Sequence, residues 1–182
     1  MERYTIKFMS RALVRVNKYS KLIKELPPHK RIAVDYPLLV RDEVARKVAK
    51  VAEQLPKKYQ LQIDSAYRDR DVQKMIYAKK PQITYNPDNG IPPHSTGGAV
   101  DVLLLNADGE GEKLLTGLMI KEGFAPHSWE SWHYSYGDLA WAGYYKRQVL
   151  YEELKLDNKI YYPLIFRILV RVYLRLAKLL SI

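Results

Sequence analysis

Two histidines and one aspartate have the residue types and spacing of metal ligands. Asp101 lies in the run Ala-Val-Asp-Val-Leu-Leu-Leu, where an ionised carboxylate costs several kcal/mol unless a cation or hydrogen-bond donors compensate it. His94 begins the loop His-Ser-Thr-Gly-Gly-Ala, whose glycines let the backbone turn tightly, so we expect this ring to fold back beside Asp101. His133 lies in Trp-Glu-Ser-Trp-His-Tyr, where aromatic side chains can exclude water and hold the imidazole still.

These three residues match the ligand count of a catalytic zinc site. Such a site uses three protein ligands and leaves a fourth position for water. The chain has no cysteine, which excludes a disulfide framework and thiolate catalysis and requires any metal site to use histidine and carboxylate ligands. The sequence therefore predicts Zn²⁺ bound by His94, Asp101 and His133.

Two further residues have the chemistry to act on a substrate at this metal. Glu130 precedes His133 by three residues, which on a regular strand would direct the two side chains to opposite faces. We therefore predict a turn or bulge at Glu130–Ser131 that directs the carboxylate towards the water, so that it acts as general base. Arg68 follows a predicted strand and could stabilise negative charge on the carbonyl oxygen under attack.

Each of these residues also has a structural interpretation. A single histidine is more often a core or surface residue than a ligand, and Asp101 could cap a turn or pair with Arg68. We interpret His29 and His127 as surface residues. The aromatic residues of the region are more typical of core packing than of substrate binding: Trp129, Trp132, Tyr134, Tyr136 and Trp141.

The pattern of apolar residues predicts an α+β domain, in which a small antiparallel sheet carries the zinc site and helices flank it. The predicted helices span 4–26, Val40–Gln54, Asp69–Lys80 and Glu112–Glu122; the predicted strands span Tyr59–Asp64, Ala99–Leu105 and Trp129–Tyr136, and Ile83–Pro93 is a loop. With 182 residues, the chain is predicted to form a zinc peptidase domain over 1–158, with its core at about 35–145. A basic amphipathic helix is predicted over 159–182.

The net charge of +10 is concentrated at the two ends of the chain. Cations recur there at intervals of four, four and three residues, at Lys7, Arg11, Arg15 and Lys18 and at Arg167, Arg171, Arg175 and Lys178. This spacing predicts basic amphipathic helices. The apolar segment 163–182 carries four of these cations, which makes crossing a membrane costly and favours peripheral contact with its surface. Packing of both terminal helices on the catalytic domain, or on a second copy of it, is equally open.

The remaining partners follow from charge and composition. A basic surface attracts nucleic acid without sequence recognition, so no specific nucleic-acid partner is expected. The N-terminal segment has a cation every three or four residues and lacks the apolar core of a secretory signal, so we expect a cytoplasmic protein. No sequence feature indicates an oligomeric state.

Three segments resemble, in order and spacing, the motifs of D-alanyl-D-alanine dipeptidases of the vancomycin-resistance type. They are Ser65-Ala-Tyr-Arg68, His94-Ser-Thr-Gly-Gly-Ala-Val-Asp101 and Glu130-Ser-Trp-His133-Tyr-Ser-Tyr-Gly-Asp138. These enzymes form one zinc superfamily with D,D-carboxypeptidases and related peptidoglycan peptidases. The resemblance implies that His94, Asp101 and His133 bind zinc, that Glu130 is the catalytic base, and that Arg68 polarises the scissile carbonyl. It also implies a small peptide containing D-Ala as the substrate.

The resemblance leaves the exact substrate open between the free D-Ala-D-Ala dipeptide and a peptidoglycan stem peptide. The stretch 132–141 is more similar to the dipeptidase branch. However, dipeptidases carry a longer insertion after the aspartate ligand, with an acidic residue that binds the substrate amino group. Asp108, Glu110 or Glu112 could replace that residue here, and a more open site would suit a D,D-carboxypeptidase or an endolysin-type peptidase. A third hypothesis is a non-enzymatic protein that binds membrane surfaces or nucleic acid through its basic ends.

Overall fold

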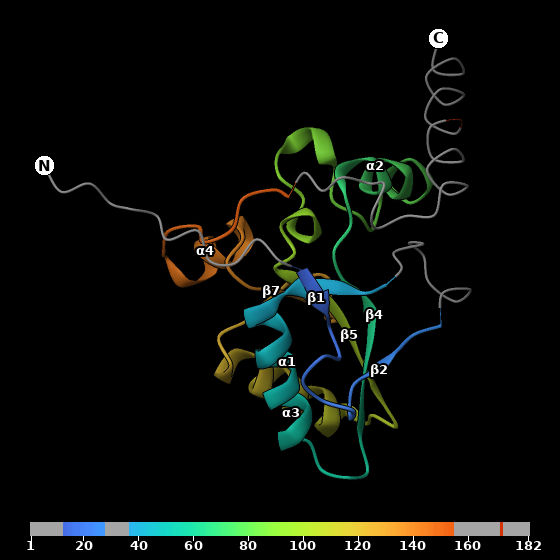
Figure 1. Ribbon diagram of the computed structural model, residues 1–182, viewed down its shortest axis with the longest axis vertical. Helices are drawn as coiled ribbons and strands as arrows, with labels where there is room; N and C mark the ends of the chain where they lie inside the picture. Colours follow the sequence, from blue (N-terminus) through green and yellow to red (C-terminus); the bar gives the residue numbers. More distant parts are fainter. Residues whose placement is uncertain (1–12, 28–36, 155–171, 173–182) are drawn as a thin grey trace, which may run out of the picture.

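The computed structural model describes residues 13–27, 37–154 and 172 (Figure 1). The strands are β1 (Leu13–Arg15), β2 (Lys24–Glu25), β3 (Leu39–Arg41), β4 (Gln60–Ser65), β5 (Ala99–Leu105), β6 (Ala125–Pro126) and β7 (His133–Ser135). The α-helices of this part of the chain are α1 (Asp42–Gln54), α2 (Arg70–Lys79), α3 (Gly109–Lys121) and α4 (Leu139–Tyr145), with the 3-10 turns η2 (Pro87–Asn89) and η3 (Pro93–Thr96). The predicted α+β class is confirmed.

Two sheets form the β part of the molecule. The larger sheet has the strand order β2-β4-β5-β7-β6, and β1 pairs with β3 in the smaller one. All pairings are antiparallel except that of β2 with β4, so the larger sheet is mixed rather than purely antiparallel. The long strand β5 lies between β4 and β7, which places its residues at the centre of the sheet.

One face of the larger sheet is covered by helices and forms the hydrophobic core. Figure 1 shows α1 and α3 together on this side of the molecule, whereas α2 lies away from them. Core residues from these elements are fully buried, among them Val48 of α1, Met119 of α3 and Val100 of β5. Burial of such side chains stabilises the fold by about 1.5–3 kcal/mol each. Packing on this face therefore fixes the position of β5, and with it the residues on the opposite face of the sheet.

The helix predicted over 4–26 is wrong within the described residues. The chain instead forms β1, a turn and β2, with Val14 opposite Val40 of β3 and Lys24 beside Gln62 of β4. Pairing with strands that come later in the chain outweighs the helical spacing of the cations. Arg15 does not join a stripe of cations but lies 3.1 Å from Glu25 in an ion pair.

Other predicted elements differ at their ends. The helix predicted from Val40 begins at Asp42, because the preceding residues belong to β3. The helix predicted from Glu112 begins earlier, at Gly109, because the Asp108 carboxylate accepts a hydrogen bond from the Gly111 amide at 2.7 Å and caps it. Residues 1–12 and the C-terminal helix predicted over 159–182, apart from Val172, lie outside the described residues.

Candidate metal centre

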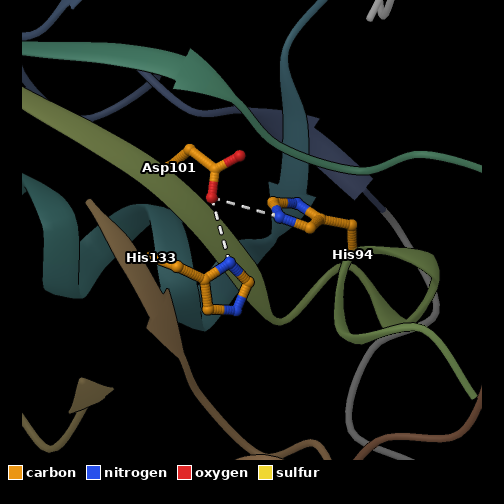
Figure 2. A group of neighbouring side chains, drawn as sticks. All are labelled: His94, Asp101 and His133. Atoms are coloured by element: carbon orange, nitrogen blue, oxygen red, sulfur yellow. Dashed lines mark hydrogen bonds and ion pairs between the residues drawn. The ribbon is translucent and has the colours of Figure 1, made fainter. Parts of the chain in front are cut away.

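The three predicted metal ligands come together in a buried group. His94, Asp101 and His133 are all buried, and their ligand atoms lie within 4.8 Å of one another. The Asp101 Oδ1 atom lies 3.2 Å from His94 Nε2 and 3.0 Å from His133 Nδ1. Figure 2 shows the two rings directed towards this one oxygen from different segments of the chain. Such a group can hold a metal ion.

Strand register explains how Asp101 meets His133. The two residues are directly opposite on the antiparallel strands β5 and β7, so their side chains share a face of the sheet. At Gly98, just before β5, a side chain would place its Cβ 2.2 Å from the Tyr136 carbonyl oxygen, so only glycine permits this close approach of the backbones. The pairing therefore depends on a residue without a side chain.

His94 reaches the group from the 3-10 turn η3. That turn ends at Gly97, whose φ of +73° is the left-handed conformation that glycine adopts readily. The chain then reverses into β5, as the two glycines predicted. The His94 ring is held from behind, because its Nδ1 lies 2.7 Å from the Ala66 carbonyl oxygen.

The hydrogen bond to Ala66 decides which nitrogen of His94 faces Asp101. A carbonyl oxygen only accepts, so Nδ1 donates and Nε2 of the neutral ring carries the lone pair. Burial lowers the pKa of His94 to about 4, which keeps the ring neutral at pH 7. Nε2 has no hydrogen-bond partner within the described part of the chain and faces Asp101 Oδ1. Two buried acceptor atoms thus face each other, an arrangement that a cation between them would stabilise.

A hydrogen bond joins Asp101 and His133, with Asp101 Oδ1 3.0 Å from His133 Nδ1. Burial alone would raise the pKa of Asp101, but the hydrogen bond from His133 holds it well below its usual range. Burial alone would lower the pKa of His133, but the hydrogen bond to Asp101 raises it. His133 Nε2 lies 3.2 Å from Ser135 Oγ, so the nitrogen away from the group has its own partner. Anchored outer nitrogens on both rings are typical of metal-binding histidines.

Glu130 lies beside this group. The turn predicted at Glu130–Ser131 is present, because the His133 amide donates to the Glu130 carbonyl oxygen at 2.9 Å. The turn directs the Glu130 carboxylate inwards, with Oε2 3.8 Å from His133 Nδ1. The carboxylate is therefore close to the group without belonging to it.

Arg68 lies on another side of Asp101. Its Nη2 is 3.7 Å from Asp101 Oδ2, so the structural pairing of these two residues exists. It uses the oxygen that faces away from the histidines and leaves Oδ1 to the two rings. The Nε atom of Arg68 is buried and has no hydrogen-bond partner among the described residues.

All five predicted site residues line one cleft of about 450 Å³. His127, which we interpreted as a surface residue, is half-buried and also lines the cleft, with its ring centroid 5.7 Å from that of His133. The cause is the pairing of β6 with β7, which brings the His127 amide to 3.1 Å from the His133 carbonyl oxygen. No local sequence signal marks that pairing. His29 lies outside the described residues.

The predictions for the neighbouring aromatic and acidic residues are met in part. Tyr134, Tyr136 and Trp141 are buried in the core, as expected. Trp129 and Trp132 are instead exposed and line the cleft. The three acidic residues considered for binding a substrate amino group do not line it: Asp108, Glu110 and Glu112.

Comparisons with known proteins add no support to the resemblance of these motifs. No protein-family model matches the chain, and no curated protein matches it. Over the part of the chain that the structure describes, none of the helices combines the length and apolar character needed to cross a membrane.

Proposed function

We propose that the protein is a zinc-dependent peptidase that hydrolyses the D-Ala-D-Ala dipeptide. The observation that carries this proposal is the buried pair of acceptors, His94 Nε2 and Asp101 Oδ1, which face each other at 3.2 Å. A metal ion with nitrogen and oxygen ligands would relieve their repulsion. Zinc is favoured because two imidazoles and one carboxylate are a donor set of catalytic zinc sites with an open position.

The reaction adds water to the peptide carbonyl and splits the carbon–nitrogen bond. Zinc held by His94, Asp101 and His133 would supply an acidified water and an electrophile. In this proposal, Glu130 takes a proton from the attacking water and gives it to the departing amine, so two molecules of D-alanine result. The position of the Glu130 carboxylate beside His133 supports this role.

Arg68 is proposed to stabilise the carbonyl oxygen as it gains negative charge. Its guanidinium is buried beside Asp101 and has an unused donor at Nε. A buried donor of this kind interacts more strongly with a developing charge than one in water does. The same contact with Asp101 holds the guanidinium in place before a substrate binds.

The proposal is tested by replacing the base while keeping the metal. Glu130→Gln should lower kcat for D-Ala-D-Ala hydrolysis by about 10²–10⁴-fold while one zinc per chain is still found by metal analysis. Glu110→Gln, an exposed carboxylate outside the cleft, is the matched control and should retain full activity. Undiminished turnover in Glu130→Gln would refute the role of Glu130. A wild-type protein that binds no zinc would refute the proposed centre.

A second candidate is a D,D-carboxypeptidase or endolysin-type peptidase that acts on peptidoglycan stem peptides. The size of the cleft, about 450 Å³, favours it, because clefts of this size hold ligands larger than a dipeptide. The distance of Asp108, Glu110 and Glu112 from the cleft supports it as well. Parallel assays with D-Ala-D-Ala and a stem peptide separate the two candidates.

The location of the protein is also a proposal. We propose the cytoplasm, with peripheral membrane contact through residues 163–182. Sedimentation with anionic liposomes should recover the full-length protein, and replacing both Arg167 and Arg171 with glutamine should reduce the recovered fraction. Equal recovery would exclude these cations from any membrane contact, and the hypothesis of a non-enzymatic membrane-surface protein would lose its main support.

A further inference from the structure

Donors from distant segments hold the turn η3, which carries the first predicted metal ligand. Three consecutive carbonyl oxygens of this turn are bound. Ser95 O accepts from the Leu154 amide at 2.9 Å, and Thr96 O accepts from Arg41 Nε at 2.8 Å. Gly97 O accepts from the Arg41 amide at 2.9 Å. The position of the turn therefore depends on contacts with β3 and with a segment far along the chain.

That segment crosses several parts of the fold. Leu154 belongs to residues 150–154, which we name the strap. The first two amides of the strap both donate to the Gly137 carbonyl oxygen at 2.8 Å, just beyond β7. At the other end, the Tyr67 hydroxyl donates to the Leu154 carbonyl oxygen at 3.2 Å. The strap thus joins η3 to the chain that follows β7 and to the chain that follows β4.

A forked ion pair fastens the strap to α2. Glu153 Oε1 lies 2.9 Å from Arg70 Nε, and Glu153 Oε2 lies 3.0 Å from Arg70 Nη2. Paired bonds of this geometry are the strong form of an arginine–carboxylate contact. The same guanidinium donates to the Pro87 carbonyl oxygen and, at 3.0 Å, to that of Gly90. One side chain therefore joins the strap to the segment that leads into η3.

Restraint of η3 bears on the candidate metal centre. His94 Nε2 and Asp101 Oδ1 are buried and face each other at 3.2 Å (Figure 2). Both atoms are acceptors, so without a cation their repulsion favours a movement of His94 away from Asp101. The anchored carbonyl groups of the turn oppose that movement. This matters for affinity, because the apparent Kd rises as the fraction of chains in the binding geometry falls.

We infer that Glu153 and Arg70 are positioning residues of the metal centre, whose ion pair keeps the strap on η3 and so holds His94 beside Asp101 before a metal ion binds. Neither residue of the pair lines the cleft, so they act through the turn rather than on a substrate. This inference rests on the proposed function for the identity of the metal, zinc.

The binding test compares two neighbouring carboxylates in the full-length, metal-free protein. Glu153→Gln removes the charge that fastens the strap. Glu152→Gln removes the same charge from an exposed side chain that makes no ion pair within the described part of the chain, and is the matched control. Competition with a chromophoric zinc chelator should give a Kd about tenfold higher in Glu153→Gln and unchanged in Glu152→Gln.

A second variant approaches the ion pair from its other side. Arg70→Lys keeps the positive charge but loses the fork, so it should also raise the Kd for zinc. An ion pair that only stabilised the fold would leave the Kd of the folded protein unchanged. Values of Kd equal to that of the wild type in both Glu153→Gln and Arg70→Lys would overturn the inference.

The spectrum of the loaded site separates positioning from ligation. At saturation, Co²⁺-loaded Glu153→Gln should have the visible absorption spectrum of the Co²⁺-loaded wild type, because the ligands are the same. His94→Gln removes a ligand and should change that spectrum. A changed spectrum in Glu153→Gln would overturn the inference, because the ion pair would then alter the coordination itself.

Activity measured beside these Kd values separates the inference from the proposed function. If the wild-type protein binds zinc, does not hydrolyse D-Ala-D-Ala, and shows the tenfold difference in Kd, the proposed peptidase fails and the positioning pair stands. If D-Ala-D-Ala is hydrolysed and Kd is the same in the wild type, Glu153→Gln and Arg70→Lys, the positioning pair fails alone.

Discussion

The first four residues of β5 are buried on both faces of the strand, yet the residues of the two faces differ in chemistry. Val100 and Val102 are directed into the core beneath α1 and α3, whereas Asp101 between them faces His94 and His133. On the apolar face, the side chains pack in the core and need no ligand. The polar face leaves His94 Nε2 without a hydrogen-bond partner among the described residues. Burial alone therefore does not distinguish the stabilising face from the candidate site; the unsatisfied polar atom does.

Polar groups on the core side contrast with this arrangement. The Tyr136 hydroxyl donates to Glu43 Oε1 at 2.6 Å, and the Tyr151 hydroxyl donates to Glu43 Oε2 at 3.1 Å. Each carboxylate oxygen there has a donor, and no cation is needed to relieve repulsion. Substitutions on the two sides should consequently differ in whether their effects depend on zinc.

The largest effect should come from the core. Phe124→Ala removes a fully buried ring and should lower the free energy of unfolding by about 3–5 kcal/mol, measured by urea denaturation. The loss should be the same with and without zinc, because Phe124 is not part of the metal group. Trp129→Ala is the matched aromatic control and should change the free energy by less than about 0.5 kcal/mol. A loss of unfolding free energy that depended on zinc would contradict the view that the core face is independent of the metal group.

Zinc should stabilise the wild-type protein through the polar face. At a free zinc concentration of about 100 times Kd, the free energy of unfolding should rise by about 2.7 kcal/mol. Asp101→Asn should abolish this increase, because the replacement removes a ligand charge. Asp71→Asn, an exposed residue of α2, should retain it. Thermal unfolding of the three proteins with and without zinc measures the effect, and an equal increase in all three would exclude Asp101 as a ligand.

The paired tyrosines should contribute less, and their contribution should depend on pH. Tyr136→Phe removes a hydrogen bond to a carboxylate and should cost about 2 kcal/mol at pH 8. Burial, and then the bond to Glu43, raise the pKa of Tyr136 well above its ordinary value of 10. The unfolded chain therefore loses its proton first, and stability should fall as the pH rises above about 10.

Urea denaturation between pH 8 and pH 11 tests the sign of this dependence. The wild-type protein should lose stability over the upper part of the range, and Tyr136→Phe should lose less, because it has one fewer group that ionises on unfolding. Burial raises the pKa of Tyr151 in the same direction, so part of the decline should persist in the variant. A steeper decline in Tyr136→Phe would contradict this account.

The smallest effect should come from the helix cap at Asp108. Its carboxylate accepts hydrogen bonds from the Gly111 amide and from the Tyr59 hydroxyl, both at 2.7 Å. Asp108→Ala should cost about 1 kcal/mol and leave kcat and KM for D-Ala-D-Ala unchanged. A rise in KM would instead return Asp108 to the list of residues that bind a substrate amino group.

The regular elements of the core could largely be predicted from local pattern. The strand Ala99–Leu105 was predicted with its observed ends, because its apolar residues continue on both faces. The short strands β1 and β2 could not be predicted, because two or three residues carry no clear period and depend on their partners in β3 and β4. The mixed character of the sheet follows from the same two strands.

The sequence by itself determined the composition of the candidate site. A carboxylate in an apolar run, a loop histidine before two glycines and a histidine among aromatic residues are local features, and each limits which partners can satisfy it. These features led to the three residues that the structure brings together, and to a turn that directs Glu130 towards them.

Only the tertiary structure decided how those atoms face one another and what surrounds them. The register of β5 with β7 sets Asp101 opposite His133, and the Ala66 carbonyl oxygen selects the nitrogen of His94 that faces the aspartate. Hairpin pairing likewise brought His127 and Trp129 to the cleft. The alternation of side chains along one segment determines which face of the sheet a residue occupies. Which residue lies beside it on that face depends on contacts between residues that are distant in the chain.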